Sequence, residues 1–405
     1  AGYAGIISGA GAIIKTGTGA LTLSGANTFT GTTTIQDASL VINSDASLGA
    51  VPGSTVAGAI VLNNGVLKTT DTFTLNAARG IQLVGTGTIN VDGATTLTYG
   101  GVMAGTGAFV KAGTGTLNLT GNSSYSGAST IAAGTLVMNG TIPSTAVLSI
   151  SAGAQLTVPH AITLSEIIGN GDVLLNAALT VGGANTSFTF GGSLSGSGSI
   201  VKTGSGTLTL SGESSHTGNT VLNASRLVLN NANALGNSTL ISSTGILELA
   251  DNLVLSRLHV AGPITITKHV QTVGQQIYDG PVTIAPTAGE VVGVENYAGV
   301  TYNPSGVKLS TSNADITFNS TIDAASAKSA SLRVDAGSGV VTIGDSVGSR
   351  APLEALYVVG RRINLLADVL TGKEQTYVGA TMIGSNGSAG FLFADFMRNT
   401  IPVAD

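Results

Sequence analysis

The chain has 405 residues, of which 58 are glycine, and it contains neither Cys nor Trp. Its 42% hydrophobic content excludes simple disorder, and its 9% of charged residues with a net charge of −5 argues against nucleic acid as a partner. No apolar run reaches the roughly 18 residues that a membrane-spanning helix needs.

A segment of nearly constant pattern occurs three times. It reads "IIKTGTGALTLSGANTFTG" at 13–31, "FVKAGTGTLNLTGNSSYSG" at 109–127 and "IVKTGSGTLTLSGESSHTG" at 200–218. Aligned on its lysine, each copy has an aromatic or His at +14, Gly at +16, Ser or Thr at +18 and Asn at +28. The lysines are Lys15, Lys111 and Lys202, and the +14 residues are Phe29, Tyr125 and His216. The constant spacing indicates repeats of one structural unit.

Each repeat alternates apolar and polar residues over short stretches, as in "ALTLSG" at 20–25, "TLNLTG" at 116–121 and "TLTLSG" at 207–212. Period-two alternation predicts strands with one buried face, and the Gly, Asn, Ser and Asp that interrupt it predict turns. No window carries a helical stripe. We therefore predict an all-β chain with essentially no α-helix.

Short strands with frequent turns fit a sandwich, a barrel, a propeller or a solenoid. Repeated units in line bury each other's faces, so a solenoid can build its core from small aliphatic side chains. A sandwich or barrel of this length would normally use more Trp, Tyr and Phe, and here aromatics are only 4%. We predict a right-handed parallel β-helix, a β-solenoid.

The repeat pattern resembles the autotransporter-associated β-strand repeat of bacterial type V secreted passengers, with copies at 13–49, 109–139 and 200–236. The third copy departs from the pattern at His216 and Arg226, which we expect on a surface turn. The resemblance implies a protein that is secreted to the bacterial cell surface through an outer-membrane translocator. It marks a scaffold and a secretion route rather than one activity.

A second pattern begins near residue 262. "TVGQQIYDGPVTI" at 272–284 and "LTGKEQTYVGATMI" at 370–383 share Gln, Tyr and Gly at a separation of 99 residues. This stretch resembles the repeats of filamentous-haemagglutinin-like giant adhesins. We therefore predict two domains: a β-helix with the three repeats at 1–261, and a continuing β-solenoid at 262–405. The second 99-residue copy stops at Asp405, so we expect the chain to be part of a longer protein.

Candidate chemistry is sparse. The glycine-rich "GTGTG" stretches lead into more strand rather than a helix, so turn glycines explain them better than a phosphate-binding loop does. Asp172 in "GNGDVLL" is the nearest approach to a calcium site, and it is not repeated in tandem. The closest carboxylate groupings, for a polysaccharide lyase or hydrolase, are Glu248 with Asp251 and Glu290 with Glu295.

The basic residues also have a bland interpretation. No metal-ligand spacing relates the four histidines, His160, His216, His259 and His269. The three repeat lysines could form a stripe for acidic glycans, but we expect them at solvated strand ends. Arg361 and Arg362 are expected on a solvated turn. We predict no catalytic, cofactor-binding or metal-ligating residue, no cofactor and no enzyme activity.

The closing segment is aromatic, with Phe391, Phe393 and Phe396 close together, and it could be a cap for an open coil edge or a contact with a neighbouring domain. Together with the resemblances, these observations predict a surface-displayed stalk or adhesin segment. Its partners would be glycans or proteins of a host or cell surface, or sister cells in a biofilm. The alternative is a structural fibre that associates end to end or laterally.

Overall fold

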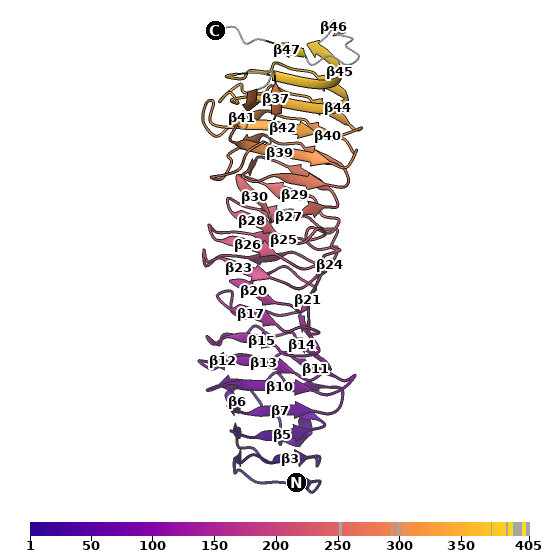
Figure 1. Cartoon of the computed structure of the whole chain (residues 1–405). Helices are drawn as coiled ribbons and strands as arrows, with labels where there is room; N and C mark the ends of the chain where they lie inside the picture. The colour runs from indigo at the N-terminus through magenta and orange to yellow at the C-terminus, as the bar shows by residue number, and fades with distance from the viewer. Residues whose placement is uncertain are drawn as a thin grey trace. The chain divides into compact units, whose positions relative to one another are not determined.

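The structure is a computed structural model that describes residues 1–250, 253–292, 295–297, 300–302, 304–373, 375–385, 388–391 and 399–401. Within these ranges the chain is all-β, with parallel coils stacked as a β-solenoid (Figure 1) and a single turn of 3₁₀-helix, η1 (Asp45–Leu48). This confirms the predicted fold class. No described helix is long and apolar enough to cross a membrane. The chain divides into two compact units, residues 1–200 and 201–405.

Unit 1, residues 1–200, is built from sheets whose strands pair parallel from one coil to the next. The longest run contains β1 (Gly2–Tyr3), β3 (Ala20–Leu23), β5 (Ser39–Ile42), β7 (Val66–Thr69), β10 (Gly87–Val91), β13 (Phe109–Ala112), β15 (Ser129–Ile131), β17 (Val147–Ile150), β20 (Glu166–Gly169) and β23 (Phe188–Phe190). A second sheet contains β2 (Ile13–Lys15), β4 (Thr33–Gln36), β6 (Val56–Asn63), β9 (Arg79–Leu83) and β12 (Met103–Gly105). A third contains β8 (Phe73–Leu75), β11 (Thr96–Tyr99), β14 (Thr116–Leu119), β16 (Thr135–Met138), β18 (Gln155–Val158), β21 (Asp172–Leu175) and β24 (Leu194–Gly196). Two short strands, β19 (Ile162–Thr163) and β22 (Leu179–Val181), pair with each other.

Unit 2, residues 201–405, continues the same local architecture after β25 (Ile200–Lys202), where the division falls. One run contains β26 (Thr207–Leu210), β28 (Arg226–Leu229), β30 (Gly245–Leu249), β33 (Ile264–Ile266), β36 (Val282–Ile284) and β41 (Ile322–Ala324). The other contains β27 (Thr220–Leu222), β29 (Leu240–Ser242), β31 (Val254–Leu255), β32 (Leu258–Ala261), β34 (Val270–Thr272), β35 (Gln276–Tyr278), β39 (Gly306–Thr311), β40 (Ile316–Phe318), β42 (Ser331–Asp335), β43 (Val340–Ile343), β44 (Leu356–Leu365), β45 (Gln375–Ser385), β46 (Ser388–Phe391) and β47 (Asn399–Ile401). A hairpin is formed by β37 (Glu295–Tyr297) and β38 (Val300–Tyr302). β46 and β47 pair antiparallel with β45.

The period-two sequence pattern becomes a period-two burial pattern. In β14 the threonine and asparagine are half-buried on the outer face while Leu117 and Leu119 are buried inside. β16, β18 and β28 repeat this inside–outside order. Alternate side chains of a strand point to opposite faces, so each short strand contributes two or three aliphatic groups to the lining of its coil.

In-register stacking places aliphatic side chains directly above one another. Leu97 pairs with Leu117, Leu117 with Leu136, and the column continues through further coils at a spacing of 17 to 21 residues. Its remaining members are Leu156, Val173 and Leu194, and all six residues are 0% exposed. Burying one such side chain contributes about 1.5–3 kcal/mol, and most of that contact area is supplied by the coils above and below.

Two predictions about the end of the chain meet the structure differently. Arg361 and Arg362, expected on a turn, lie instead within the long strand β44, where the register with β45 shifts between Val359 and Arg362. A β-bulge bends the strand there and lets both arginines stay exposed without a turn. The aromatic segment 391–396 lies outside the described residues, except for the backbone of Phe391.

Candidate functional site in the repeat units

The lysine of each repeat is an internal hydrogen-bond donor. Lys111 Nζ lies 2.9 Å from the carbonyl oxygen of Ala112 and 2.8 Å from that of Gly113, and it reaches Ala133 in the following coil at 3.0 Å. The other copies repeat the first two bonds, from Lys15 to Thr16 and Gly17 and from Lys202 to Thr203 and Gly204. The prediction of solvated strand ends is wrong for Lys111 and Lys202, which are 0% and 1% exposed, while Lys15 is half-buried.

The turn after the lysine brings these carbonyls within its reach. In all three copies the second residue after the lysine has a left-handed backbone: Gly17 has φ 76°, Gly113 has φ 75° and Gly204 has φ 71°. A side chain is strained at such a φ, which is why glycine occupies this position. Burial lowers the pKa of Lys111 to about 8 and lowers that of Lys202 as well. The lysine therefore caps its own turn and does not form a basic stripe for glycans.

The residue at +14 is also internal, which corrects the expectation of a surface turn. Phe29 and Tyr125 are each 1% exposed and His216 is 0% exposed. Tyr125 Oη lies 2.7 Å from Ser129 Oγ, and His216 Nε2 lies 3.1 Å from Thr220 Oγ1. Each polar +14 side chain thus bonds to the hydroxyl four residues later. Desolvation lowers the pKa of His216 to about 4, so the imidazole is neutral at pH 7.

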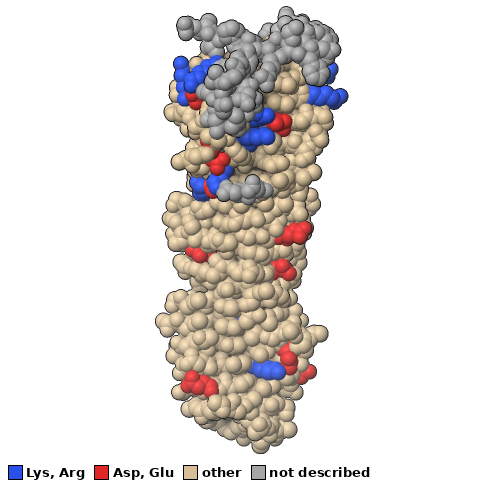
Figure 2. All heavy atoms as spheres, in the orientation of Figure 1, with Lys and Arg blue, Asp and Glu red and all other residues tan. Residues whose placement is uncertain are grey.

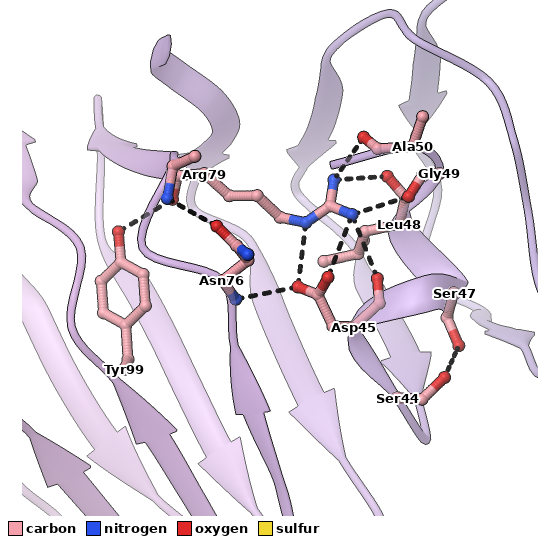
Figure 3. A network of polar contacts seen from close by, with 10 residues as sticks. Ser44, Asp45, Ser47, Leu48, Gly49, Ala50, Asn76, Arg79 and Tyr99 are labelled. Carbon is pink, nitrogen blue, oxygen red and sulfur yellow. Dashed lines mark hydrogen bonds and ion pairs between the residues drawn. The ribbon is translucent and has the colours of Figure 1, made fainter. Parts of the chain in front are cut away.

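An arginine from a later coil braces the turn that follows the first repeat (Figure 3). Arg79 is 3% exposed, and its Nε donates to Asp45 Oδ1 at 2.9 Å. Its Nη1 donates to the carbonyl oxygen of Leu48 at 2.9 Å and its Nη2 to that of Gly49 at 2.6 Å. Tyr99 Oη in turn donates to the carbonyl oxygen of Arg79 at 2.9 Å. A buried charge with this many partners ties η1 to β9.

The third repeat has a counterpart of this brace. Its "LG" pair, Leu235–Gly236, occupies the same register as Leu48–Gly49. Arg257 Nη2 donates to the carbonyl oxygen of Asn237 at 2.5 Å, and Asn237 occupies the register of Ala50, which accepts from Arg79 Nη1 at 3.3 Å. Sequence reasoning missed both arginines. They follow the leucine by 31 and 22 residues, and this unequal spacing hid their common role.

The candidate acidic groups are divided among ion pairs. Glu248 pairs with Arg226, which begins β28 rather than lying on a surface turn, and Glu248 Oε1 is 3.7 Å from Lys268 Nζ. An ionised carboxylate between two cations is poorly suited to donate a proton. Glu290 Oε2 is 3.4 Å from His269 Nδ1. The structure therefore does not join Glu248 with Glu290 as a catalytic pair, and Asp251 and the side chain of Glu295 lie outside the described residues.

The remaining candidates are spread over different coils. His160 is exposed, and Asp172 accepts a hydrogen bond from Ser193 Oγ at 2.7 Å. His259 Nε2 lies 2.6 Å from Asp279 Oδ2, and Asn319 Nδ2 donates to Asp279 Oδ1 at 2.8 Å. These hydrogen bonds lower the pKa of Asp279, that from His259 most. Among the described residues, no three His, Asp or Glu side chains are close enough to hold a metal ion together.

Charge is unevenly divided between the units. Residues 1–200 hold four of the 16 Lys and Arg residues and six of the 21 Asp and Glu residues. On the face drawn in Figure 2, the coils of unit 1 accordingly show few charged side chains, and more of them gather on the later coils of unit 2. Unit 2 therefore offers more varied polar chemistry for recognition.

The comparisons with known proteins agree with the repeats. A family model for the passenger-associated transport repeat matches residues 13–42, 109–138 and 200–224. Over 122 residues, 30% of this chain, the sequence is 39% identical to the protein named Adhesin BmaC autotransporter from Brucella suis biovar 1 (strain 1330). That match spans only 3% of the relative's length. No solved structure matches.

The repeat polar groups serve the scaffold, since their lysines, +14 side chains and bracing arginines all bond within the chain. The starts of the three matched segments coincide with the repeats read from the sequence, which confirms that prediction. The resemblance of residues 262–405 to haemagglutinin repeats stays a prediction. A parallel β-solenoid carrying passenger-associated transport repeats, with an autotransporter adhesin as a relative, is a repeat-bearing segment of an autotransporter passenger, a class of protein secreted to the bacterial cell surface.

Proposed function

We propose that this segment is a non-enzymatic part of a bacterial surface adhesin and that it mediates attachment to host surfaces or to sister cells. The observation that carries the proposal is the set of three passenger repeats on a β-solenoid, combined with 39% identity to a protein named as an adhesin. A stack of coils presents a long wall of side chains, and binding can draw on several coils at once. An outer-membrane translocator would be the partner in secretion.

The 99-residue relation in unit 2 belongs to this proposal, as repetition of one wall structure. Tyr278 Oη donates to Gln276 Oε1 at 2.9 Å, and Tyr377 Oη donates to Gln375 Oε1 at the same distance. In both copies the glutamine Nε2 also donates to the backbone carbonyl oxygen six residues earlier, of Val270 and Val369. The same local contacts at both positions support two copies of one unit, with boundaries near 262.

Attachment is tested with the purified chain bound to fluorescent beads. We expect the beads to adhere to cultured epithelial cells or to aggregate bacteria that display the same protein, and beads with heat-denatured chain to do neither. Electron microscopy of the same preparation separates the alternatives, since long regular fibres from the chain alone would favour a structural filament. Absence of adhesion to both kinds of cell, with the chain folded by circular dichroism, would contradict the proposal.

A further inference from the structure

The wall of unit 2 contains a groove of about 400 Å³, which we call the Lys268 groove. It is lined by Leu249, Ala250, Leu253, Lys268, His269, Gln271 and Glu290. Most of these residues lie in the short connections of two coils, which join β30 to β31 and β33 to β34. The volume falls within the range typical of small-molecule sites, about 300–1,000 Å³.

The groove lies beside an interruption of the stack. The connections after β30 and β33 have four and three residues, whereas the one between β36 and β39 runs from 285 to 305 and carries the β37–β38 hairpin. Its first residues still stack, because Thr287 N donates to the carbonyl oxygen of Thr267 at 3.0 Å. The excursion then departs from the corner and no longer covers the connection below it. Long insertions in a regular scaffold are where binding sites concentrate.

The base of the excursion is fixed, so the groove is preformed. Gly306 N donates to the carbonyl oxygen of Glu290 at 3.0 Å, and Glu290 N donates to that of Thr287 at 3.1 Å. Val292, 1% exposed, belongs to a buried cluster with Ala355 and Tyr357. A site held on both sides by backbone hydrogen bonds and an apolar anchor has less ordering cost on binding.

The polar groups of the groove are held in defined positions. His269 Nδ1 accepts a hydrogen bond from the Lys308 backbone N–H at 3.1 Å, and it lies 3.4 Å from Glu290 Oε2. When Nδ1 accepts, the ring proton is on Nε2, so the imidazole can donate through its other nitrogen. Lys268 is held by Glu248, whose second cationic partner is Arg226. The side chains of Lys268 and Glu290 are 25% and 19% exposed, so part of each lies at the surface.

This set of groups matches the chemistry of a sugar. Lys268 and His269 donate, Glu290 accepts and Gln271 does both, which suits neighbouring hydroxyl groups. Leu249 and Leu253 offer an apolar surface to the C–H face of a pyranose ring. The charges of Lys268 and Glu290 cancel, and a neutral lining favours a neutral ligand over a sulfated or phosphorylated one.

We propose that the Lys268 groove binds the terminal residue of a neutral cell-surface glycan. This rests on the proposed attachment function and names the chemistry of its ligand. Glycoside hydrolysis normally uses two carboxylates flanking the scissile bond, and Glu290 is the single carboxylate among the seven described lining residues. The groove therefore holds the sugar without cleaving it.

The test uses the full chain and an array of glycans that end in galactose, N-acetylglucosamine or mannose, with sialylated and sulfated counterparts. Titration calorimetry then measures affinity for the best neutral glycan. We expect Glu290→Gln and Lys268→Met each to weaken binding at least tenfold. Glu354→Gln is the matched control, because Glu354 also pairs with a lysine, Lys373, but lies outside the groove, and it should leave affinity unchanged.

Several results would overturn the proposal. They are the absence of binding to any neutral glycan at millimolar concentration, equal affinity of the Glu290→Gln and Glu354→Gln variants, a stronger response to the acidic glycans, and release of reducing sugar. Equal melting temperatures of the variants exclude unfolding as the cause of lost binding. The bead assay separates the two proposals: if Glu290→Gln beads still adhere fully, the groove is wrong and the attachment function stands, whereas wild-type beads that fail to adhere contradict the attachment function itself.

Discussion

The buried histidine of the third repeat makes stability dependent on pH. His216 is fully buried where the other repeats carry Phe29 and Tyr125, and its pKa is lowered to about 4 because burial disfavours the imidazolium. His216 Nδ1 has no hydrogen-bond partner. Replacement of His216 by Phe or Tyr installs the residue that the equivalent site already accommodates, so these variants remove the titration while preserving the volume of the core.

The size of the effect follows from the two pKa values. A histidine that titrates near 6.5 when unfolded and near 4 when folded is neutral in the folded state between these values, while the unfolded state takes up a proton. The stabilisation is therefore fully present above pH 6.5 and is lost as the pH falls through 4. The difference corresponds to about 3 kcal/mol in total, and to about 2 kcal/mol by pH 5.

The assay is urea unfolding at pH 7.5 and pH 5, accompanied by hydrogen exchange of residues 216–222 because long repeat arrays can unfold in parts. Carboxylates also titrate in this interval, so the quantity compared is the loss of stability in wild type minus the loss in His216→Phe. We expect wild type to lose about 2 kcal/mol more than the variant. At pH 7.5 the variant should be at least as stable, since it removes the unpartnered Nδ1 and Thr220 Oγ1 keeps Ser238 Oγ at 2.9 Å. Equal losses in the two proteins would refute the reasoning.

Three further predictions concern the repeats and their braces. Lys111→Met leaves the carbonyls of its turn without their donor and should cost about 1–3 kcal/mol in urea unfolding, with a smaller loss for Lys15→Met because Lys15 is half-buried; equal losses would contradict the capping role. Arg79→Ala strands the charge of its partner and should cost about 3–5 kcal/mol, seen as faster hydrogen exchange in residues 45–49, and unchanged exchange there would rule out the brace. Gly127→Ala places a Cβ 2.2 Å from the carbonyl oxygen of Gly107 and should lower the melting temperature by several degrees, whereas the control Gly183→Ala meets nothing within 4 Å and should not.

The alternation of small polar and aliphatic residues was enough to predict the strands and the solenoid. Leu117 and Leu119 face inward because a strand has period two, and this rule needs no knowledge of distant contacts. Exact spacing among the three copies likewise fixed the repeats, since in-register stacking tolerates few insertions at the stacked positions. These features are local and can be read from the sequence.

The polar interior could not be read in the same way. Lys111 follows Phe109 by two positions and shares its inward face, but the intervening Val110 is also apolar, so alternation alone did not decide which face was buried. Charge then suggested solvent for the lysine, whereas the structure supplies carbonyl oxygens at its Nζ. The constant recurrence of lysine beside a glycine turn was the signal that could have indicated a structural role.

The braces and the groove depend on contacts between coils. Arg79 and Asp45 are 34 residues apart and meet only because one coil lies on the next. Glu290 was noted in the sequence for its neighbour Glu295, yet its described partners are His269 and the backbone at the foot of the excursion. Such partnerships require the length of each connection, which the sequence pattern does not specify.

Stacking of parallel strands in register, one coil apart, is the claim on which the account depends. The chain has no cysteine, so cysteines placed at Val110 and Thr130 can be labelled with pyrene specifically. These two residues are register partners in β13 and β15, and adjacent strands lie about 4.8 Å apart. We predict strong excimer fluorescence from this pair and only monomer emission from Val110 combined with Val137, which lies in a different sheet. Monomer emission from the Val110–Thr130 pair in the folded chain would contradict the solenoid.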